Sequence, residues 1–532
     1  MGQAKGKQHN KSKKAGHRPA PGGFTAKSPP VVSMVSLGCS KNTVDSERIL
    51  GQLAGSGFLI AEDLRLADAI LVNTCGFIDE SRQETQAVLA EMARLKKSGK
   101  AQAVVALGCM VERIARGPEL EKYLTPADHR IGFNDYPQIP QLLGKMLRFD
   151  LPSGGGAAAV AAGEAASTGT AAPTANMAAR GGYSLFWSQP RLRIGAAHSA
   201  YLKISEGCSN PCAFCSIPSM RGKLASRGIA EIVAEARQLK QSGVFEYNLI
   251  AQDSTGFGRD RTPDRSSQLK ELLTALAAET GSEAWIRLFY AYPRWLDLDV
   301  IDLLASGDPF CPYIDMPLQH HSDRILRDMR RMVTQADQLH ILDEIAKRMP
   351  KGALRTTFIV GYPGETDAEF TELLNFVKEG RFTHVGVFTY STEPGTPAAR
   401  EADSVPMADK LARRQAIMAA QREIATKRMQ SMVGQTLEVL VDGLSDGRRA
   451  HGHAESLPMS YELPIAGQAP ELQSQEAWWL ARTKLDGPEV DGNVYLPADL
   501  PLEPGDRLPV KIVKALEYDL VGEAVEVPTQ GA

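Results

Sequence analysis

Strand-like runs alternate with amphipathic helical patterns from residue 201 onward. Six such runs can be distinguished, at residues 201–205, 247–253, 284–293, 313–320, 353–365 and 384–391. A helical pattern follows each of the first five, and a long amphipathic stretch at 408–434 ends the series. Successive strands joined by helices pair in parallel, because the helix returns the chain to the same edge of the sheet. The series therefore predicts a partial six-stranded parallel barrel of the (β/α)6 type.

The first of these strands runs directly into three cysteines. Cys208, Cys212 and Cys215 follow one another with Cys-x3-Cys-x2-Cys spacing, which is typical of metal ligands. A structural zinc site takes four ligands, and no fourth Cys or His follows at a suitable short distance. Three thiolates on an iron–sulfur cluster would instead leave one iron open to another ligand. We therefore favour an iron–sulfur cluster over a structural metal knot or three buried thiols.

A second group of cysteines lies in the N-terminal part of the chain. Strand-like runs occur there at residues 31–37, 69–74 and 103–108, and the helical patterns between them predict an open α/β domain. Cys39, Cys75 and Cys109 each stand at the end of one of these runs. The carboxyl ends of parallel strands share one edge of the sheet, so these thiols are expected to converge on a second metal site. Buried structural cysteines are the alternative.

Length and cysteine content limit the class of protein. A chain of 532 residues needs about two to four domains. Seven cysteines, with no secretory signal at the N-terminus, point to a reducing compartment rather than to disulfides. No apolar run reaches the ~18 residues of a membrane span. We expect a cytoplasmic protein without a membrane segment, in which Cys311 is a small buried apolar residue.

Composition divides the chain into segments. The expected parts are a disordered basic tail (1–30), the α/β domain (31–150), a low-complexity linker (151–197), the βα barrel (198–430) and a small β-barrel (431–528) with an insertion near 450–480. The tail either attracts RNA or a ribosome or merely aids solubility. Trp478 and Trp479 are expected in the core of the small barrel.

Charge is uneven along the chain. Residues 435–532 hold 17 acidic and 7 basic side chains, a net charge of −10. Nucleic acid would be repelled by such a domain at ordinary salt. The C-terminal domain is therefore expected to contact a protein, and in particular a basic one.

Further polar and glycine residues stand at the ends of the barrel strands. They are Gln252, Asp253, Tyr290, Tyr292, Gln319, His320 and the turn holding Gly361, Pro363 and Gly364. Glycine lets backbone approach a ligand closely, so we expect this turn and Gln252 to bind a cofactor, although a tight βα loop is the simpler explanation. His320 and His321 are interpreted as structural residues at the barrel rim.

Several stretches together resemble the methylthiotransferase family of the radical S-adenosylmethionine (SAM) superfamily. They are SLGCSKNTVDSERIL, VNTCGFIDES, YLKISEGC, CSIPSMRG, IDMPLQHHSDRILRDMRR and FIVGYPGET. The resemblance implies an N-terminal methylthiotransferase domain, a radical SAM barrel and a C-terminal TRAM domain. It further implies two [4Fe-4S] clusters, with Cys39, Cys75 and Cys109 holding the auxiliary cluster and Cys208, Cys212 and Cys215 holding the SAM-binding one. Phe214 matches the aromatic residue that this superfamily places near the SAM adenine.

In sequence, these stretches are most similar to the branch of the methylthiotransferase family that modifies ribosomal protein uS12. That branch implies transfer of a methylthio group to the β-carbon of an aspartate, with a reducing electron donor and a sulfur donor as partners and no catalytic side chains beyond the cluster ligands. Two alternatives are methylthiolation of a tRNA adenosine and, from another class, a non-catalytic iron–sulfur protein of the ribosome. The acidic C-terminal domain disfavours the first, and the lack of a fourth ligand for each site disfavours the second.

Overall fold

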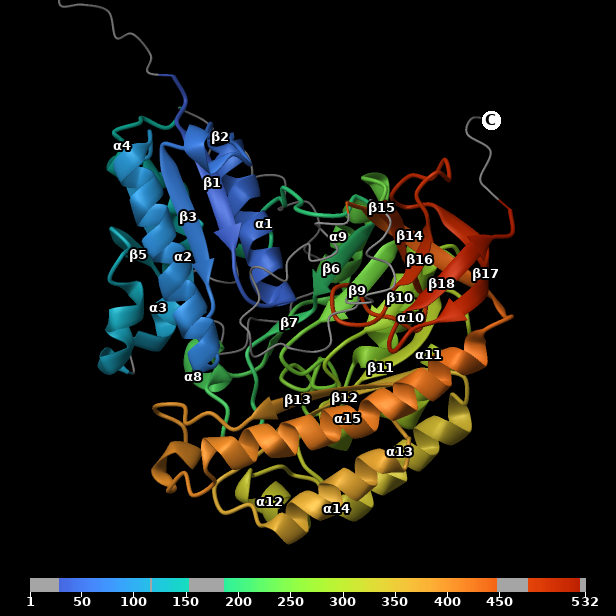
Figure 1. Cartoon of the computed structure of the whole chain (residues 1–532). Coiled ribbons are helices and arrows are strands. Elements are labelled where there is room, and N and C mark those ends of the chain that lie inside the picture. Colours follow the sequence, from blue (N-terminus) through green and yellow to red (C-terminus); the bar gives the residue numbers. More distant parts are fainter. Residues whose placement is uncertain (1–27, 115–116, 153–185, 447–476, 527–532) are drawn as a thin grey trace, which may run out of the picture.

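The computed structural model describes residues 28–114, 117–152, 186–446 and 477–526. Figure 1 shows an N-terminal α/β domain in blue, a βα barrel in green and yellow, and a small β-barrel in red. The expected basic tail up to residue 27 and most of the expected insertion lie outside the described residues, as do residues 153–185 of the expected linker. In the ranges that are described, no helix combines the length and apolar character needed to cross a membrane.

The N-terminal domain is built on a five-stranded parallel sheet with the order β2-β1-β3-β4-β5. Its strands are β1 (Val31–Ser36), β2 (Leu59–Ile60), β3 (Ala69–Thr74), β4 (Ala103–Gly108) and β5 (His129–Ile131). Its helices are α1 (Ser40–Gly55), α2 (Asp79–Ser98), α3 (Cys109–Ile114) and α4 (Ile139–Leu147), with 3-10 turns at Leu64–Leu66, Pro118–Leu124 and Phe133–Gln138. Every residue of β3 and β4 is buried, because helices cover both faces of a parallel sheet.

Six parallel strands form the central barrel, in the order β13-β12-β11-β10-β9-β6. They are β6 (Ser199–Lys203), β9 (Glu246–Ile250), β10 (Trp285–Leu288), β11 (Phe310–Asp315), β12 (Ala353–Val360) and β13 (His384–Thr389). The covering helices are α9 (Ile229–Gln241), α10 (Leu269–Thr280), α11 (Leu298–Ala305), α12 (Asp323–Asp328), α13 (Gln335–Arg348), α14 (Asp367–Lys378) and α15 (Met407–Met432), with a 3-10 turn at Pro293–Trp295 and another at Ala398–Arg400. The predicted partial six-stranded barrel is confirmed.

Helix α10 illustrates how this barrel acquires its core. Leu269, Leu272, Leu273 and Leu276 recur at the spacing that places side chains on one face of a helix, and all four are buried. They pack into the apolar cluster that fills the barrel between its strands and helices. Cys311, inside β11, is fully buried among apolar side chains, as predicted.

The C-terminal domain is a closed five-stranded barrel with the order β14-β15-β16-β18-β17. Its strands are β14 (Thr436–Asp446), β15 (Ala477–Thr483), β16 (Val494–Pro497), β17 (Arg507–Ala515) and β18 (Leu520–Ala524). The prediction of a small β-barrel is confirmed, but residues 477–480, expected to end the insertion, instead begin β15. Trp478 and Trp479 are half-buried, and the Trp479 indole donates a hydrogen bond to the Leu500 carbonyl at 3.0 Å. The cross-strand pairing of β15 with β14 thus places these residues in the barrel wall.

The last part of the expected linker is ordered against the N-terminal domain. Phe186 and Trp187 are buried in its core, and the Leu192 amide donates to the Glu47 carbonyl at 2.9 Å. A Cβ atom at Gly51 would lie 2.2 Å from the Pro190 carbonyl oxygen, so this segment lies directly on α1. Residues 186–197 of the expected linker thus lie against the N-terminal domain, where Phe186 and Trp187 anchor them.

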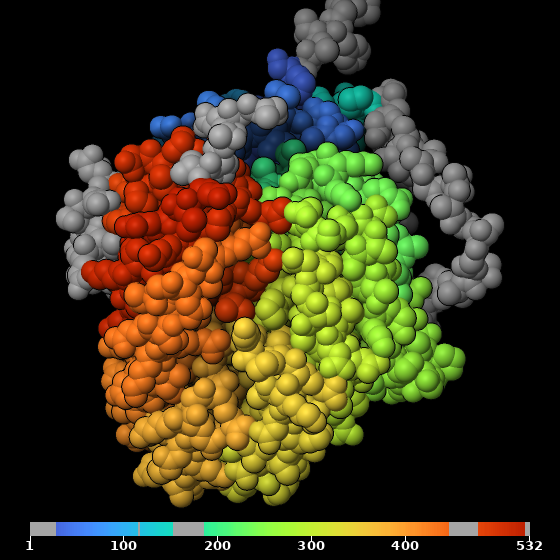
Figure 2. Space-filling view, turned by 90° about the vertical axis from the view of Figure 1, so that its right-hand side faces the viewer, coloured from blue at the N-terminus to red at the C-terminus, as the bar shows by residue number. Residues whose placement is uncertain are grey.

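Helix α15 connects the two barrels. Its side chain Met429 is buried in the core of the small barrel, whereas Ile417 is buried in the core of the βα barrel. Figure 2 shows α15 in orange, joining the surface of the red barrel to that of the yellow helices. The two barrels are consequently joined through the core positions of one helix.

Candidate active site

The three N-terminal cysteines follow the carboxyl ends of three adjacent strands. Cys39 lies just before α1, Cys75 follows β3, and Cys109 is the first residue of α3 after β4. A Cβ atom added at Gly38 would lie 2.9 Å from the Cys75 Cβ, so the first two loops touch. Gly38 also has a φ of +88°, which glycine adopts without strain. The first two cysteine-bearing loops therefore converge at one edge of the sheet.

Asn42, in the first turn of α1, ties all three loops together. Its Nδ2 donates to the Leu37 carbonyl at 2.8 Å and to the Thr74 carbonyl at 3.1 Å. Its Oδ1 lies 3.7 Å from the Cys109 Sγ. One buried amide thus fixes the ends of β1, β3 and β4 relative to one another.

The barrel cysteines lie in the loop after β6 and β7 (Ser205–Glu206), ahead of α8 (Ile217–Arg221) and β8 (Ala225–Ser226). The Cys208 amide donates to the Gly222 carbonyl at 2.9 Å, and the Cys215 amide donates to the Cys212 carbonyl at 3.2 Å. These bonds close the loop, so that its three thiols share one small region.

Hydrogen-bond donors point at sulfur atoms in both groups. Arg221 Nε lies 3.3 Å from the Cys109 Sγ, and Arg331 Nη1 lies 3.5 Å from the Cys212 Sγ. The Asn210 amide lies 3.5 Å from the Cys208 Sγ. Guanidinium groups and amides stabilise negative charge on sulfur, which is the state of a thiolate that binds metal.

Burial opposes these donors, because it favours the neutral thiol over the thiolate and so raises the pKa of a buried cysteine. It raises the pKa of Cys109 to about 12, against the partial compensation of Arg221, and it raises the pKa of Cys208 to about 12 as well. The pKa values of Cys75 and Cys215 are raised for the same reason. Of the six cysteines Cys109 is buried, Cys39 is exposed and the other four are partly exposed. A bound cation would deprotonate such thiols outright, and metal coordination is therefore the natural use of cysteines with donors aimed at their sulfur atoms.

A single metal ion does not fit these groups. Within the described residues, no three His, Cys, Asp or Glu side chains are close enough to hold one ion. In an iron–sulfur cluster each thiolate binds a separate iron, so its ligands stand further apart than those of one ion. The two sets of three thiols, with donors aimed at sulfur, fit clusters of this kind. Cys311 is in the barrel core and cannot complete either set.

A buried ionic network joins the two cysteine sites across the domain boundary. Lys203, at the end of β6, pairs with Asp45 of α1 and with Glu206 at 3.0 Å. Arg221 pairs with the same two carboxylates, at 3.1 Å and 3.0 Å. Its Nη2 also donates to Asn42 Oδ1 at 2.6 Å. Arg221 therefore contacts the N-terminal cysteine site although it follows the barrel cysteines in sequence.

Two predicted cofactor-binding residues lie beside the barrel cysteines. Phe214 is half-buried and packs against an apolar cluster that contains Tyr362 and Tyr390. Gln252 donates to Glu206 Oε1 at 2.9 Å, and its own Oε1 is buried with no hydrogen-bond partner among the described residues. An acceptor without a partner costs free energy, so this oxygen is suited to a ligand that donates a hydrogen bond.

The glycine turn after β12 has a structural explanation of its own. Gly361 has a φ of +72°, and a Cβ there would lie 2.2 Å from the Lys410 Cγ on α15. The Gly364 amide, at a φ of +76°, donates to Ser404 Oγ at 2.8 Å. Close packing of α15 thus requires glycine at 361, and cofactor binding by Gly361, Pro363 and Gly364 stays a prediction.

Aromatic residues at the strand ends border both sites. The Tyr290 ring lies under the ammonium of Lys41, 2.9 Å from it, and Lys41 stands two residues after Cys39. The Tyr292 ring lies 4.1 Å from the Arg331 guanidinium, which in turn contacts Cys212. Tyr290 and Tyr292, two residues apart after β10, therefore border different cysteine sites, the first the N-terminal site and the second the barrel site.

His320 and His321 are structural, as predicted. His320 is fully buried and accepts from the Ser322 amide at 3.0 Å. The His321 ring stacks on Phe376 at 3.6 Å, and burial lowers its pKa.

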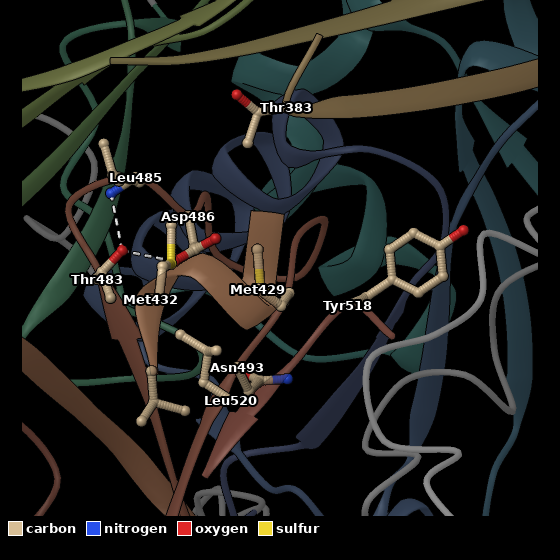
Figure 3. A pocket seen from close by; sticks show the side chains of 11 residues that line it. Thr383, Met429, Met432, Thr483, Leu485, Asp486, Asn493, Tyr518 and Leu520 are labelled. Atoms are coloured by element: carbon tan, nitrogen blue, oxygen red, sulfur yellow. Dashed lines mark hydrogen bonds between the residues drawn. The ribbon is translucent and has the colours of Figure 1, made fainter. Parts of the chain in front are cut away.

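A small cavity lies elsewhere, between α15 and the small barrel (Figure 3). Met429 and Met432 of α15 face Thr483, Asp486 and Leu520 across it, and Thr483 accepts from the Leu485 amide at 3.1 Å. None of its lining residues belongs to either cysteine site, so the cavity has no part in the chemistry of those sites.

The negative charge of the C-terminal domain does not all face solvent. Asp442 and Asp491 are paired with Arg482 and Arg355, at 2.5 Å and 2.6 Å. The exposed acidic side chains include Glu438, Glu503, Glu517 and Glu523. The surface available to a partner is acidic, though less so than the net charge suggests.

Sequence reasoning missed the polar residues that surround the cysteines. Asn42, Asp45, Glu206, Arg113 and Arg221 are all buried at the domain boundary. Charged residues are rarely buried unless paired, and their partners here are far away in sequence. Among these residues, only Asn42 could have been assigned to the site from the sequence, because it lies one helical turn after Cys39.

Three family models match this chain. Residues 202–377 match the model described as "Radical SAM superfamily", residues 31–132 match "Uncharacterized protein family UPF0004", and residues 470–525 match "TRAM domain". Three cysteines at the mouth of an open parallel barrel, together with the first match, define a radical SAM enzyme. Enzymes of this class use SAM together with an iron–sulfur cluster.

Three relatives narrow this class. "Ribosomal protein uS12 methylthiotransferase RimO" of Syntrophotalea carbinolica is 38% identical over 93% of this chain and 97% of its own length. Its counterpart in Anaeromyxobacter sp. strain K is 39% identical, over 93% of each chain, and that of Symbiobacterium thermophilum is 37% identical over 95% of this chain and 93% of its own. The chain belongs to the RimO family of methylthiotransferases. A solved radical SAM methyltransferase, TsrM from Kitasatospora setae, is a distant likeness, 13% identical with a TM-score of 0.47 over 70% of this chain and 77% of its own.

Proposed function

We propose that this chain adds a methylthio group to the β-carbon of an aspartate in ribosomal protein uS12. The observation that carries this proposal is the pair of three-cysteine sites on either side of one domain boundary, in a chain of the RimO family. One site alone would serve radical chemistry of many kinds. The second three-cysteine site would hold the sulfur close to the site where the radical forms.

The residues assigned to the two sites are the six cysteines. Cys208, Cys212 and Cys215 would hold the [4Fe-4S] cluster that binds SAM, and Cys39, Cys75 and Cys109 would hold an auxiliary [4Fe-4S] cluster. When bound, these groups supply the one-electron chemistry and the sulfur that an unactivated C–H bond requires and that no side chain can provide. An electron donor and a sulfur donor are needed as partners.

The protein contributes position and charge. Arg331 and Arg221 place guanidinium groups against cysteine sulfur atoms and offset the cost of negative charge in a buried site. The unpartnered Gln252 Oε1 is proposed to accept from the amino group of SAM. Phe214 is proposed to form an apolar wall for the adenine, supported by the cluster that contains Tyr362.

A protein substrate is favoured over tRNA by the exposed acidic side chains of the C-terminal domain. Dense phosphate charge would be repelled there, whereas a basic ribosomal protein would be attracted. The proposed substrate, a ribosomal protein, implies a cytoplasmic place of action.

The test is a competition between the two substrates. Purified, cluster-reconstituted enzyme with SAM, dithionite and sulfide is offered a uS12 peptide and total tRNA in one reaction, and both are analysed by mass spectrometry. A methylthio group on the aspartate of the peptide supports the proposal. Modification of a tRNA adenosine with an unchanged peptide would overturn it, and the Cys212→Ala variant controls for chemistry that needs no enzyme.

A further inference from the structure

Two short helices, each directly after a cysteine site, pack against each other at the domain boundary. Helix α3 begins at Cys109 in the N-terminal domain, and α8 begins two residues after Cys215 in the barrel. Each carries an arginine near its end, Arg113 and Arg221, and both side chains are 3% exposed. Both guanidinium groups reach out of their own helix.

Arg113 reaches from the N-terminal domain to the barrel site. Its Nη1 donates to the Gly76 carbonyl at 2.8 Å, beside Cys75, and to Ser216 Oγ at 2.6 Å, beside Cys215. Its Nη2 donates to Glu393 Oε2 at 2.6 Å. One guanidinium therefore bonds the immediate neighbour of a cysteine from each site.

Arg221 reaches in the opposite direction. It follows the barrel cysteines, yet its Nε contacts the Cys109 Sγ at 3.3 Å and its Nη2 donates to Asn42 at 2.6 Å. Its Nη1 stays with Glu206 of the barrel and Asp45 of the N-terminal domain. The two arginines thus cross the boundary reciprocally, each from the helix after one site to the other site.

We propose that Arg113 and Arg221 are positioning residues that hold the two cysteine sites at a fixed separation. The proposal rests on the proposed function, which requires an intermediate formed at one site to meet sulfur at the other. A displacement of about 1 Å can cost a reaction a hundredfold, so two sites on separate domains need a rigid connection. Arginine suits this task because its planar group offers five donors in fixed directions and stays charged.

Arg113 is the better of the two to test. Glu393 also pairs with Arg82 at 2.6 Å, so replacing Arg113 leaves no unpaired carboxylate. Arg221, in contrast, is shared by two buried carboxylates, and removing it would endanger folding. The test variant is Arg113→Met, and a second variant, Ser216→Ala, removes the acceptor beside Cys215 and leaves the pair of Arg113 with Glu393 in place. Arg130→Met, at a surface pair with Glu121 in the same domain, is the matched control.

The first measurement is hydrogen–deuterium exchange of the protein without clusters. The amides of Cys215, Ser219 and Met220 make backbone bonds in the barrel loop and α8. In Arg113→Met we expect them to exchange at least roughly tenfold faster, since two charge-assisted bonds across the boundary, to Ser216 and to Glu393, are lost, and Arg130→Met should leave them unchanged. Unchanged exchange at these barrel amides in both Arg113→Met and Ser216→Ala would show a merely local role and overturn the proposal.

The second measurement is the coupling of radical formation to transfer in the reconstituted enzyme. Arg113→Met should still form 5′-deoxyadenosine, but the amount formed per methylthiolated peptide should rise roughly tenfold or more. Arg113→Lys should recover part of the coupling, because it keeps the charge and one donor. An unchanged ratio in Arg113→Met would contradict the proposal. If the unaltered enzyme forms no methylthiolated peptide, the proposed function fails, while the exchange data still decide whether the arginines connect the domains.

Discussion

Glu235 on α9 is expected to be the residue on which the attachment of the N-terminal domain depends most. Its carboxylate pairs with Arg48 of α1 at 2.7 Å, with Arg191 of the segment 186–197 at 2.8 Å and with Arg227 of the barrel at 2.6 Å. All four side chains are less than 10% exposed. One carboxylate therefore balances three buried guanidinium groups from three parts of the chain.

The change Glu235→Gln keeps the shape of the side chain and removes its charge. Breaking a buried ion pair from one side costs about 3–5 kcal/mol, because the remaining charge stays buried without compensation. For a cooperative unit of about 150–250 residues, such as the βα barrel, that corresponds to a fall in melting temperature of roughly 6–20 °C. Arg191 keeps Glu47 as a second partner, which places the expected loss toward the lower end of that range.

The loss should depend on pH with a definite sign. Burial alone would raise the pKa of Glu235, but Arg227, Arg48 and Arg191 outweigh burial and hold the pKa well below its usual range. A depressed pKa in the folded state contributes stability above the unfolded value of about 4.3, and that contribution is lost as the pH falls toward the folded value. The difference in melting temperature between the unaltered chain and Glu235→Gln should therefore be full at pH 7 and shrink below about pH 4.

Calorimetry of the cluster-free chain at about pH 7 and about pH 3.5 measures this difference, since the two values lie on either side of the unfolded pKa. Glu279→Gln is the matched control, because Glu279 pairs with Arg237 of the same helix α9 at the surface and should show little change. A melting temperature of Glu235→Gln equal to that of Glu279→Gln at neutral pH would refute the reasoning. If the difference in melting temperature between the unaltered chain and Glu235→Gln grew on acidification, the predicted direction of the pH dependence would be refuted.

Four further changes test the site and its supports. Cys212→Ala should lose the SAM-binding cluster and 5′-deoxyadenosine formation while iron analysis and electron paramagnetic resonance still detect the other cluster; loss of both would contradict independent sites. Cys109→Ala should keep 5′-deoxyadenosine formation and lose the methylthiolated product, and any product would count against the auxiliary site. Gln252→Met should weaken SAM binding roughly tenfold in equilibrium dialysis through loss of one acceptor, whereas unchanged binding would remove it from the SAM site. Gly361→Ala should cost about 2–5 kcal/mol in denaturant unfolding, from strain and from collision with α15, and Gly395→Ala, which has a similar φ but open space, only about 1 kcal/mol; equal losses would contradict the packing argument.

The barrel could be predicted from sequence because its strands are buried on both faces. Runs such as Tyr247–Ile250 and Ala353–Val360 are therefore continuously strand-like and easily distinguished from helices. The positions of the cysteines followed from the same pattern, since strand ends meet at one edge. Strand β15 was missed, because Trp478 and Trp479 are both half-buried and show no alternation.

The connections between the domains could not be predicted. Lys203 lies within a strand-like run and Glu235 on an amphipathic helix, where charged residues usually face solvent. Their partners Asp45 and Arg48 are more than 150 residues away in sequence. Only the fold shows that these charges are buried together. It also shows how the two cysteine sites are placed relative to each other.

Mass spectrometry of uS12 from cells that lack this gene tests the central claim most directly. We predict that the target aspartate of uS12 is unmodified in those cells, and that the unaltered gene restores the methylthio group while the Cys109→Ala version does not. A uS12 aspartate that carries the methylthio group without the gene, or a tRNA adenosine that loses it instead, would contradict the claim.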